Sequence, residues 1–374
     1  MVKIVVIIGG GFYGISTAKR LSGNPDVKVK LINASNHAYF YISSIRVPVQ
    51  NKTEGTFIPI KELLPSDVEI INDVVEEFNE DEVLLQKGGK LEFDSLVIAT
   101  GSKWTNPIGS SLEFGNDHVA YFNKRHKELE AAKHIILVGG GFNNTELVGE
   151  LIHQYQDQLK TGEKRITIIH SQDLLLPNNG FYSDKLRTSI TNFIKNSNVE
   201  LKLNSKAEKL SKDSSTLIIN GDPSSTISGD YIIYGTGTLP AVPSNLIKGL
   251  TDSNGFILVD DSFRVKAISN NKVFSIGDVT DFEFRGLMFR NSWLNALVNN
   301  IKLTLEDQDV EDSKLHKVTR PKGHVPAGVS LGPNHGFGQI PLPWFGTIAA
   351  PSWFVTWYKS KNLVVNAARR LFNS

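Results

Sequence analysis

Two stretches of the chain repeat one pattern, a short apolar run that ends in three glycines. The first reads IVVIIGGGFYG at residues 4–14, and the second reads HIILVGGGFNNTELVGE at residues 134–150. Runs of this length are typical of buried strands, and the segments after them carry apolar residues at helical spacing. Each triple glycine therefore turns a strand into a helix. The offset of 130 residues exceeds the repeat length of a solenoid, so the sequence predicts a duplicated domain type.

The same alternation of apolar runs and helical stretches continues along the chain and predicts an α/β fold. Further apolar runs lie at 29–32, 95–100, 166–170, 231–237 and 272–278. They show little alternation of polar and apolar residues, which is typical of parallel sheets covered on both faces. We expect helices at 15–23, closing on Gly23, and at 143–160. A chain of 374 residues suits two or three modules, because single cores stop growing at roughly 250–300 residues.

Glycine turns between a strand and a helix are typical of sites that bind the phosphates of dinucleotides. The first glycine makes the tight turn, the second lets a pyrophosphate approach the backbone, and the third lets helix and strand pack closely. The phosphates then meet free N–H groups and the positive end of the helix dipole. Two such sites predict an electron donor and an acceptor, for which NADH or NADPH and FAD are the natural pair. The alternative is that the glycines serve packing alone.

Five glycine-containing signatures follow one another along the chain. They are Gly9-Gly10-Gly11-Phe12-Tyr13-Gly14; Ala99-Thr100-Gly101-Ser102; Gly139-Gly140-Gly141 with Glu146; Gly235-Thr236-Gly237; and Ser275-Ile276-Gly277-Asp278-Val279. Three further stretches are SSIRV at 43–47, IHSQ at 169–172 and KSKNL at 359–363. Over nearly its whole length the chain resembles flavoproteins with two Rossmann-like dinucleotide-binding domains, and within them the apoptosis-inducing-factor-like group that includes ferroptosis suppressor protein.

The resemblance implies an FAD-binding domain that is interrupted by an inserted NAD(P)H-binding domain. The FAD-binding domain would occupy residues 1–110 and 252–312, and the NAD(P)H-binding domain residues 111–251. A small basic and aromatic C-terminal region would occupy residues 313–374.

The resemblance also implies roles for single residues at the FAD site. Asp278 corresponds to a carboxylate that binds the ribityl chain, with a simple turn residue as the alternative. By the same analogy Arg46 and the aromatic run 39–41 would lie along the phosphates and ring of FAD, and Val75 beside the adenine. Lys103, next to the ATGS turn, is assigned to the same site.

Two charged residues are predicted to act in catalysis. Glu146 corresponds to a carboxylate beside the nicotinamide and flavin, although a carboxylate in the first helical turn is also favoured by the helix dipole. Lys359 matches a lysine close to the flavin, where a cation would stabilise the anionic reduced ring. The alternative for Lys359 is one more surface lysine.

Three positions depart from the usual dinucleotide pattern. Second strands usually end in an acidic residue that binds the ribose hydroxyls, but here Asn33 and His170 stand at those positions. Without a carboxylate at His170 the 2′-phosphate of NADPH would not be repelled, so NADH, NADPH or both are expected. Asn144 replaces the third glycine of the second turn, and we expect a slightly wider approach of its helix.

The absence of cysteine decides which electron-transfer routes are open. With 0 Cys, the chain has no thiol relay and no thioether link, so FAD is expected to bind non-covalently. Its nine His form no HExxH or HxxxH pattern, and no metal site is expected. The acceptor must therefore reach the flavin itself, and a flat, apolar quinone fits this requirement.

The C-terminal region differs in composition from the rest of the chain. It carries no acidic residue and eight basic ones, although the formal net charge of the whole chain is only +1. Residues 323–358 contain no Asp, Glu, Lys or Arg but several Trp and Phe residues. Such a segment is typical of an interfacial membrane contact, and prolines argue against a spanning helix. Ordinary core packing or a homodimer contact are the alternatives.

The sequence thus predicts an FAD-dependent NAD(P)H:quinone oxidoreductase. The alternatives are a reductase of a small iron-sulfur protein and an apoptosis-related signalling protein that binds nucleic acid, although the low net charge gives no strong nucleic-acid signal. The chain starts its first strand near Lys3, without a recognisable signal or transit peptide. We therefore expect a cytoplasmic protein that is not secreted, free or peripheral on a membrane such as the mitochondrial surface or a lipid droplet.

Overall fold

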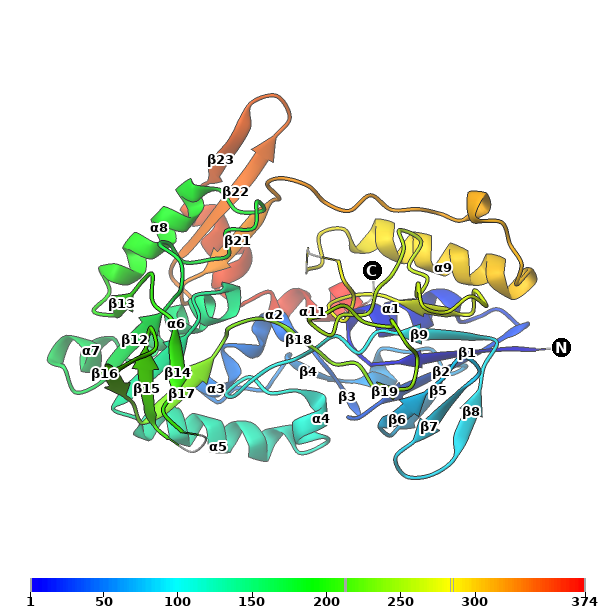
Figure 1. Ribbon diagram of the computed structural model, residues 1–374, viewed down its shortest axis with the longest axis horizontal. Helices are drawn as coiled ribbons and strands as arrows, with labels where there is room; N and C mark the ends of the chain where they lie inside the picture. Colours follow the sequence, from blue (N-terminus) through cyan, green and yellow to red (C-terminus); the bar gives the residue numbers. More distant parts are fainter. Residues whose placement is uncertain (1, 212–213, 283, 285, 373–374) are drawn as a thin grey trace.

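Two parallel sheets lie side by side in the molecule (Figure 1). Figure 1 shows the computed structural model, which describes residues 2–211, 214–282, 284 and 286–372. The first sheet has the strand order β20 (Val273–Ser275), β9 (Ser95–Ile98), β1 (Lys3–Ile8), β2 (Val27–Asn33) and β5 (Glu69–Asn72). The second has the order β13 (Glu200–Lys202), β12 (Arg165–Ile169), β11 (His134–Val138) and β17 (Tyr231–Tyr234). The predicted α/β class with parallel sheets is confirmed.

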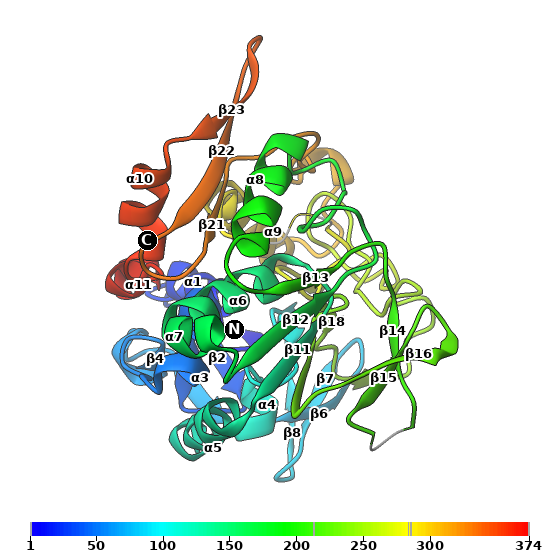
Figure 2. The same cartoon turned by 90° about the vertical axis from the view of Figure 1, so that its left-hand side faces the viewer.

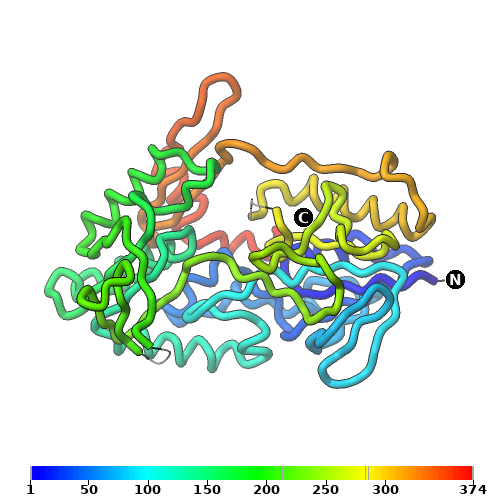
Figure 3. The backbone as a smooth tube through the Cα atoms, in the orientation of Figure 1, coloured from blue at the N-terminus to red at the C-terminus, as the bar shows by residue number. Residues whose placement is uncertain are grey.

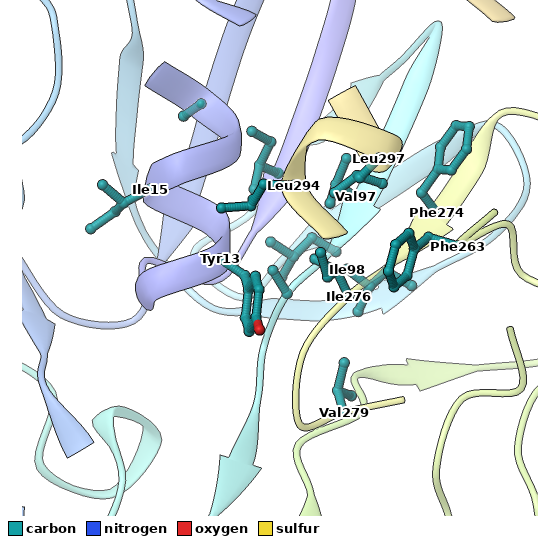
Figure 4. Close-up of a cluster of buried hydrophobic side chains, with 14 of the residues drawn as sticks. Tyr13, Ile15, Val97, Ile98, Phe263, Phe274, Ile276, Val279, Leu294 and Leu297 are labelled. Carbon is teal, nitrogen blue, oxygen red and sulfur yellow. The ribbon is translucent and has the colours of Figure 1, made fainter. Parts of the chain in front are cut away.

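The first sheet is the middle layer of three. Helices α1 (Phe12–Leu21) and α9 (Arg290–Glu306) lie on one face, and Figure 4 shows Leu294 and Leu297 of α9 beside Val97 of β9. The other face is covered by a smaller sheet. Its strands are β19 (Ser244–Asn245), β6 (Val75–Phe78), β7 (Glu82–Leu85) and β8 (Lys90–Glu92). Strand β20 follows the whole second sheet in sequence, so segments far apart in the chain build the first sheet together.

The second sheet repeats this layering and explains why β11 is apolar throughout. Ile135 and Leu137 of β11 pack with α6 (Phe142–Gln154) and α8 (Asp184–Lys195) on one face. Ile136 and Val138 pack on the other face against a three-stranded antiparallel sheet. That sheet is formed by β14 (Ala207–Lys209), β15 (Thr216–Ile219) and β16 (Asp222–Ser228). Both faces of β11 are therefore buried, which removes the alternation expected of a half-exposed strand.

The helices after the glycine turns begin earlier than the sequence predicts. Helix α1 starts at Phe12, directly after the turn, and ends before Gly23, whose φ is +76°. The single helix expected at 143–160 is divided into α6 and α7 (Gln156–Thr161) at Tyr155. The ring of Tyr155 is buried there, 4.4 Å from Lys164 Nζ, and its non-helical backbone angles interrupt the helix.

The C-terminal region starts with a long connection from α9 that crosses to the second sheet (Figure 3). Its elements are η2 (Asp312–Lys314), β21 (Ala327–Ser330), β22 (Gly336–Leu342), β23 (Gly346–Ala350), α10 (Ser352–Val355), the π-helix η3 (Thr356–Ser360) and α11 (Val365–Phe372). The β22–β23 hairpin projects away from the body (Figure 2). Helix α11 returns to α1, where Phe372 is buried 5.9 Å from the ring of Phe12.

Shorter elements connect these layers. They are β3 (His37–Tyr39), α2 (Tyr41–Ser44), α3 (Val47–Gln50), β4 (Phe57–Pro59), η1 (Ile60–Glu62), β10 (Ser102–Lys103), α4 (Ser111–Phe114), α5 (His118–Ala131) and β18 (Leu239–Pro240). Strand β10 pairs with β18 and so ties the two halves of the molecule together.

Candidate functional site

The two glycine turns have the same geometry. Gly9 and Gly139 have φ angles of +110° and +97°, which favour glycine. A Cβ atom at Gly9 would lie 2.4 Å from the Ala99 carbonyl oxygen, and one at Gly139 would lie 2.3 Å from that of Gly235. Each turn is thus pressed against the end of a neighbouring strand, and the helix that follows begins directly at the turn.

The third position of the turn differs between the two copies, and the neighbouring strand differs with it. A Cβ atom at Gly14 would lie 1.9 Å from the Gly9 carbonyl oxygen, so α1 leaves no room for a side chain. In the second copy the buried Asn144 Nδ2 donates to the Gly139 carbonyl oxygen at 2.9 Å. The space for Asn144 exists because Gly235 stands where the first copy has Ala99: a Cβ atom at Gly235 would lie 2.4 Å from Asn144 Nδ2.

Asn33 and His170 make equivalent contacts at the ends of the second strands. Asn33 Oδ1 accepts the N–H of Gly10 at 2.8 Å, and His170 Nδ1 accepts the N–H of Gly140 at 3.0 Å. This contact requires an unprotonated Nδ1, and burial lowers the pKa of His170. The basic residues Lys164 and Arg165 lie at the other end of β12, away from His170. Lys164 Nζ donates there to the carbonyl oxygens of Leu129 and Glu130 at the end of α5.

A cavity of about 450 Å³, here called cavity 1, opens at the first glycine turn. The predicted FAD-site residues that line it are Gly9, Gly11, Phe12, Tyr13, Asn33, Tyr39, Phe40, Tyr41, Val75, Thr100, Gly101, Lys103, Gly277 and Asp278. The hydroxyl oxygens of Thr100 and Ser102 are buried beside it without a hydrogen-bond partner among the described residues. The turn, the two hydroxyl groups and the mixed lining of the cavity fit a dinucleotide such as FAD.

Tyr13 and Gly277 join the first turn to the last signature. A Cβ atom at Gly277 would lie 2.9 Å from the Tyr13 ring, and the Tyr13 hydroxyl donates to the Gly286 carbonyl oxygen at 3.0 Å. Burial raises the pKa of Tyr13, and the nearby Asp278 raises it further. Tyr13 is therefore a neutral hydrogen-bond donor that joins the start of α1 to the segment around Gly277 and Gly286 in the lining of cavity 1.

A second cavity of about 480 Å³, here called cavity 2, opens at the second glycine turn. The predicted site residues that line it are Lys103, Gly141, Asn144, Glu146, Gly235, Gly237, Asp278 and Lys359. Apolar side chains from other segments, including Leu239, Met288 and Val325, complete the lining.

The two cavities share a wall. The residues that line both include Tyr41, Ile42, Lys103, Trp104, Asp278 and Leu287. A dinucleotide that extends from the first turn along cavity 1 and one that extends from the second turn along cavity 2 would meet at this wall. Trp104 was not predicted to belong to the site, although it directly follows Lys103 and the ATGS turn.

Glu146 and Lys359 form an ion pair in cavity 2. Lys359 Nζ lies 2.6 Å from Glu146 Oε1, donates to the Gly328 carbonyl oxygen at 2.9 Å, and lies 4.8 Å from the centre of the Phe142 ring. Glu146 Oε1 also accepts the N–H of Ser330 at 2.7 Å. Since α6 begins at Phe142, Glu146 is its fifth residue. The expectation of a first-turn carboxylate was therefore wrong, and the contacts of Glu146 come from the C-terminal region.

Four predicted site residues line neither cavity. Gly14 packs against the Gly9 carbonyl oxygen and Gly139 against the Gly235 carbonyl oxygen, and His170 accepts a hydrogen bond from the Gly140 N–H. Arg46 makes a bidentate contact with the buried Glu150, with Nε–Oε2 at 2.8 Å and Nη2–Oε1 at 2.5 Å. The structure thus brings most of the predicted residues to the two cavities but places the Arg46 guanidinium group in a separate ion pair.

Gly149 is a site residue that the sequence analysis missed. It lies inside α6, and a Cβ atom there would lie 2.4 Å from Leu331 Cα. It therefore allows the C-terminal region to approach the helix face that carries Glu146 and Glu150. A glycine within a helical pattern costs about 1 kcal/mol relative to alanine, and this cost is a signal of close approach.

Four basic residues of the C-terminal region form ion pairs within the chain. Lys317 pairs with Asp312, Arg320 with Asp261 and Asp281, Lys359 with Glu146, and Arg369 with Glu62. Half of the eight cations are therefore bound to acidic groups of the chain.

Aromatic side chains of the same region are exposed. The exposed fractions are 98% for Trp344, 83% for Phe345, 72% for Trp353, 67% for Trp357 and 63% for Tyr358. We call these five residues the aromatic surface; it spans the tip of the β22–β23 hairpin and the α10–η3 segment (Figure 2). In the part of the chain that the structure describes, no helix is long and apolar enough to cross a bilayer, and no cluster of His, Asp and Glu could hold a metal ion.

Comparisons with known proteins agree with this arrangement. Residues 3–302 match the family model described as pyridine nucleotide-disulphide oxidoreductase. The chain is 40% identical to apoptosis-inducing factor 1 of Saccharomyces cerevisiae, over 99% of this chain and 98% of the yeast protein. It is 26% identical to ferroptosis suppressor protein 1 of Xenopus tropicalis, over 97% of this chain and 94% of the frog protein.

A solved structure shares the whole fold. The sulfide:quinone oxidoreductase of Aquifex aeolicus aligns with a TM-score of 0.75 and 19% identity, over 99% of this chain and 92% of the bacterial chain. The predicted resemblance to apoptosis-inducing-factor-like and ferroptosis-suppressor-like proteins is confirmed. The chain therefore belongs to the pyridine nucleotide-disulphide oxidoreductase family, whose members are FAD-dependent enzymes that use pyridine nucleotides.

Proposed function

We propose that this chain is an FAD-dependent NAD(P)H:quinone oxidoreductase. In the overall reaction NAD(P)H, a quinone and one proton give NAD(P)⁺ and a quinol. FAD held in cavity 1 would supply the carrier that accepts a hydride and passes on two electrons. The observation that carries the proposal is the wall that cavities 1 and 2 share, because a donor in cavity 2 can reach a ring in cavity 1 there.

The residues of cavity 1 are proposed to bind and orient FAD. The turn from Gly9 to Gly11 offers backbone N–H groups at the start of α1 to the pyrophosphate. Thr100 and Ser102 offer hydroxyl groups that lack a partner among the described residues. Asp278 lies in the shared wall and would face the ribityl chain and ring.

Glu146 and Lys359 are proposed to act from the lining of cavity 2, which shares a wall with cavity 1. The side chain of Lys359 is largely buried, so its charge acts through a lower dielectric than that of water. A fixed cation at this place would stabilise the negative charge that the reduced ring carries. Glu146 holds this cation in place from the lining of cavity 2, where the nicotinamide would bind.

A quinone is favoured as the acceptor for three reasons. The chain contains 0 Cys, so electrons cannot leave through a thiol pair, although the family name refers to disulphides. After the oxidised nucleotide has left, cavity 2 would offer apolar side chains such as Leu239, Met288 and Val325, and these suit a flat, apolar ring. A solved relative by fold is itself a quinone reductase.

We further propose that the aromatic surface lies on a membrane from which a lipid-soluble quinone is drawn. Indole and phenol rings prefer the interface between lipid and water. The proposed location is cytoplasmic and peripheral to such a membrane. NADH and NADPH are both proposed as donors, because neutral His170 offers neither a carboxylate against the 2′-phosphate nor a fixed cation for it.

The acceptor is tested by steady-state kinetics of the purified, FAD-loaded chain. Rates with a soluble ubiquinone analogue and with a ferredoxin are compared at saturating NADH, and fast turnover with the quinone is expected. Slow quinone turnover with fast ferredoxin turnover would reject the quinone and favour an iron-sulfur protein as the acceptor.

A further inference from the structure

The Arg46–Glu150 pair joins a partly buried arginine to a buried carboxylate and lies outside both cavities. The exposed fractions of the two side chains are 13% and 1%. Glu150 receives two hydrogen bonds from one guanidinium group, the geometry in which an arginine and a carboxylate bind most strongly. Burial raises the pKa of Glu150, and the hydrogen bonds from Arg46 oppose this change. The hydrogen bonds from Arg46 therefore favour the charged form of Glu150.

Arg46 joins three segments that are distant in sequence. It lies between α2 and α3, close to Tyr41 and Ile42 of the shared wall, and it reaches Glu150 on α6. Its guanidinium group also donates to the carbonyl oxygens of Ser360 at 2.8 Å and Lys361 at 3.1 Å. These are the two residues that directly follow Lys359. Arg46 thus holds the backbone that carries the cavity lysine.

Two ion pairs run side by side along α6. Glu146 and Glu150 are four residues apart and therefore lie on one face of the helix. Glu146 binds the ammonium group of Lys359, and Glu150 binds Arg46, which in turn binds the backbone after Lys359. The segment around Lys359 is a π-helix, an unusual form that is frequent at functional sites. Glu146 thus fixes the side chain of Lys359, and Glu150 fixes the backbone after Lys359 through Arg46.

A purely stabilising role explains this arrangement poorly. A buried ion pair is often no more stabilising than apolar residues of similar volume, because both charges lose their hydration. The two further hydrogen bonds of Arg46 go to the carbonyl oxygens of Ser360 and Lys361, the residues that follow Lys359.

We propose that Arg46 and Glu150 are positioning residues that hold Lys359 in the lining of cavity 2, beside Glu146. This inference rests on the proposed function of Lys359 but concerns a pair that lines neither cavity. Loss of either partner would free the backbone of η3 and let the lysine leave Glu146. Misplacement of a catalytic group by about 1 Å lowers a rate by up to roughly 100-fold, and a similar loss is expected here.

The test compares Arg46→Lys with Arg264→Lys as a matched control. Arg264 also contacts a carboxylate through Nε and Nη2, at 2.9 and 2.8 Å from Asp260 Oδ2. It pairs in addition with Asp312 and lies outside the linings of both cavities. Each variant keeps its positive charge and loses the guanidinium geometry. The parent, both variants, Lys359→Met and the double variant of Arg46→Lys with Lys359→Met are prepared.

The first readout needs neither FAD nor turnover. Trypsin is added to the apoproteins, and cleavage after Lys359 and Lys361 is followed by mass spectrometry. We expect Arg46→Lys to be cleaved at these sites at least about 10-fold faster than the parent, because local opening exposes the backbone. Arg264→Lys should be cleaved there at the parental rate. Equal protection of this segment in the parent and Arg46→Lys would overturn the inference.

The second readout is the rate at which NADH bleaches the flavin in a stopped-flow experiment. Arg46→Lys should be about 10- to 100-fold slower than the parent, and the double variant should be no slower than Lys359→Met alone. Losses that multiply in the double variant, or an equal loss in Arg264→Lys, would contradict the positioning role. If the parent itself is not bleached by NADH, the proposed function fails, whereas the trypsin result still decides whether Arg46 holds the segment.

Discussion

The first turn combines Gly14 with Ala99, whereas the second combines Asn144 with Gly235 at the corresponding positions. This difference predicts that mutations of Asn144 and Gly235 compensate each other. In Gly235→Ala the new methyl group would lie 2.4 Å from Asn144 Nδ2 and 2.5 Å from Asn144 Cγ. Overpacking of this kind costs about 1–3 kcal/mol. If the Asn144 side chain turns away, it loses its hydrogen bond to the Gly139 carbonyl oxygen, which costs about 0.5–1.5 kcal/mol. We therefore expect Gly235→Ala to lower the free energy of unfolding by about 2 kcal/mol.

The partner mutation should remove part of this cost. Asn144→Gly alone loses the same hydrogen bond and places a glycine in α6, which costs about 1 kcal/mol or more. The double variant recreates the Gly and Ala combination of the first turn, so the clash is absent. Urea unfolding of the four proteins gives the coupling free energy, and we expect it to favour the double variant by about 1–2 kcal/mol. Strictly additive effects, or a Gly235→Ala variant as stable as the parent, would refute the steric explanation.

Three other consequences can be measured. His170 must be neutral to accept the Gly140 N–H, and burial lowers the pKa of His170. The stabilisation that His170 contributes is therefore complete above the unfolded-state pKa of about 6.5. It is lost as the pH falls toward the lower folded-state pKa. His170→Asn, which copies the Asn33 contact of the first turn, should remove this part of the pH dependence in urea titrations, and an unchanged profile would contradict it. Gly149→Ala should lower the free energy of unfolding by about 1–3 kcal/mol despite the better helix propensity of alanine, because the methyl group meets Leu331 Cα at 2.4 Å; a more stable variant in the same titration would show that the C-terminal region moves aside freely. Replacement of Trp344 and Phe345 by serine should weaken co-sedimentation with liposomes while turnover of a soluble quinone analogue stays unchanged, and undiminished liposome binding would exclude the hairpin tip as a membrane contact.

The glycine turns could be predicted from the sequence because local rules govern them. A strand that runs into three glycines and then a helix needs its backbone geometry wherever it occurs, so Gly9, Gly139 and the residues around them were found correctly as turns. The layering was also predictable in part, since the fully apolar β11 requires cover on both faces. The sequence did not predict that a small antiparallel sheet covers one of these faces, because β14 and β16 are too polar to be recognised as strands.

Contacts between distant segments set the limit of the sequence analysis. The ion pair of Glu146 and Lys359 joins residues 213 positions apart, and neither side chain carries a local sign of the other. The roles of Arg46 and Glu150 depend on the same packing of the C-terminal region on α6. No periodicity within either segment reports this packing. Gly149 was the one local clue, since a glycine inside an apolar helix pattern indicates close approach.

The central claim is that a donor in cavity 2 reduces a flavin in cavity 1 across their shared wall. The purified chain, loaded with FAD and kept anaerobic, is mixed with NADH while the visible spectrum is recorded. We expect rapid loss of the flavin band in the parent and a rate lower by about 10-fold or more in Lys359→Met, with FAD still bound, because charge stabilisation of this kind is worth at least that factor. A chain that shows no flavin band after incubation with FAD, or a bound flavin that NADH does not bleach, would contradict the account.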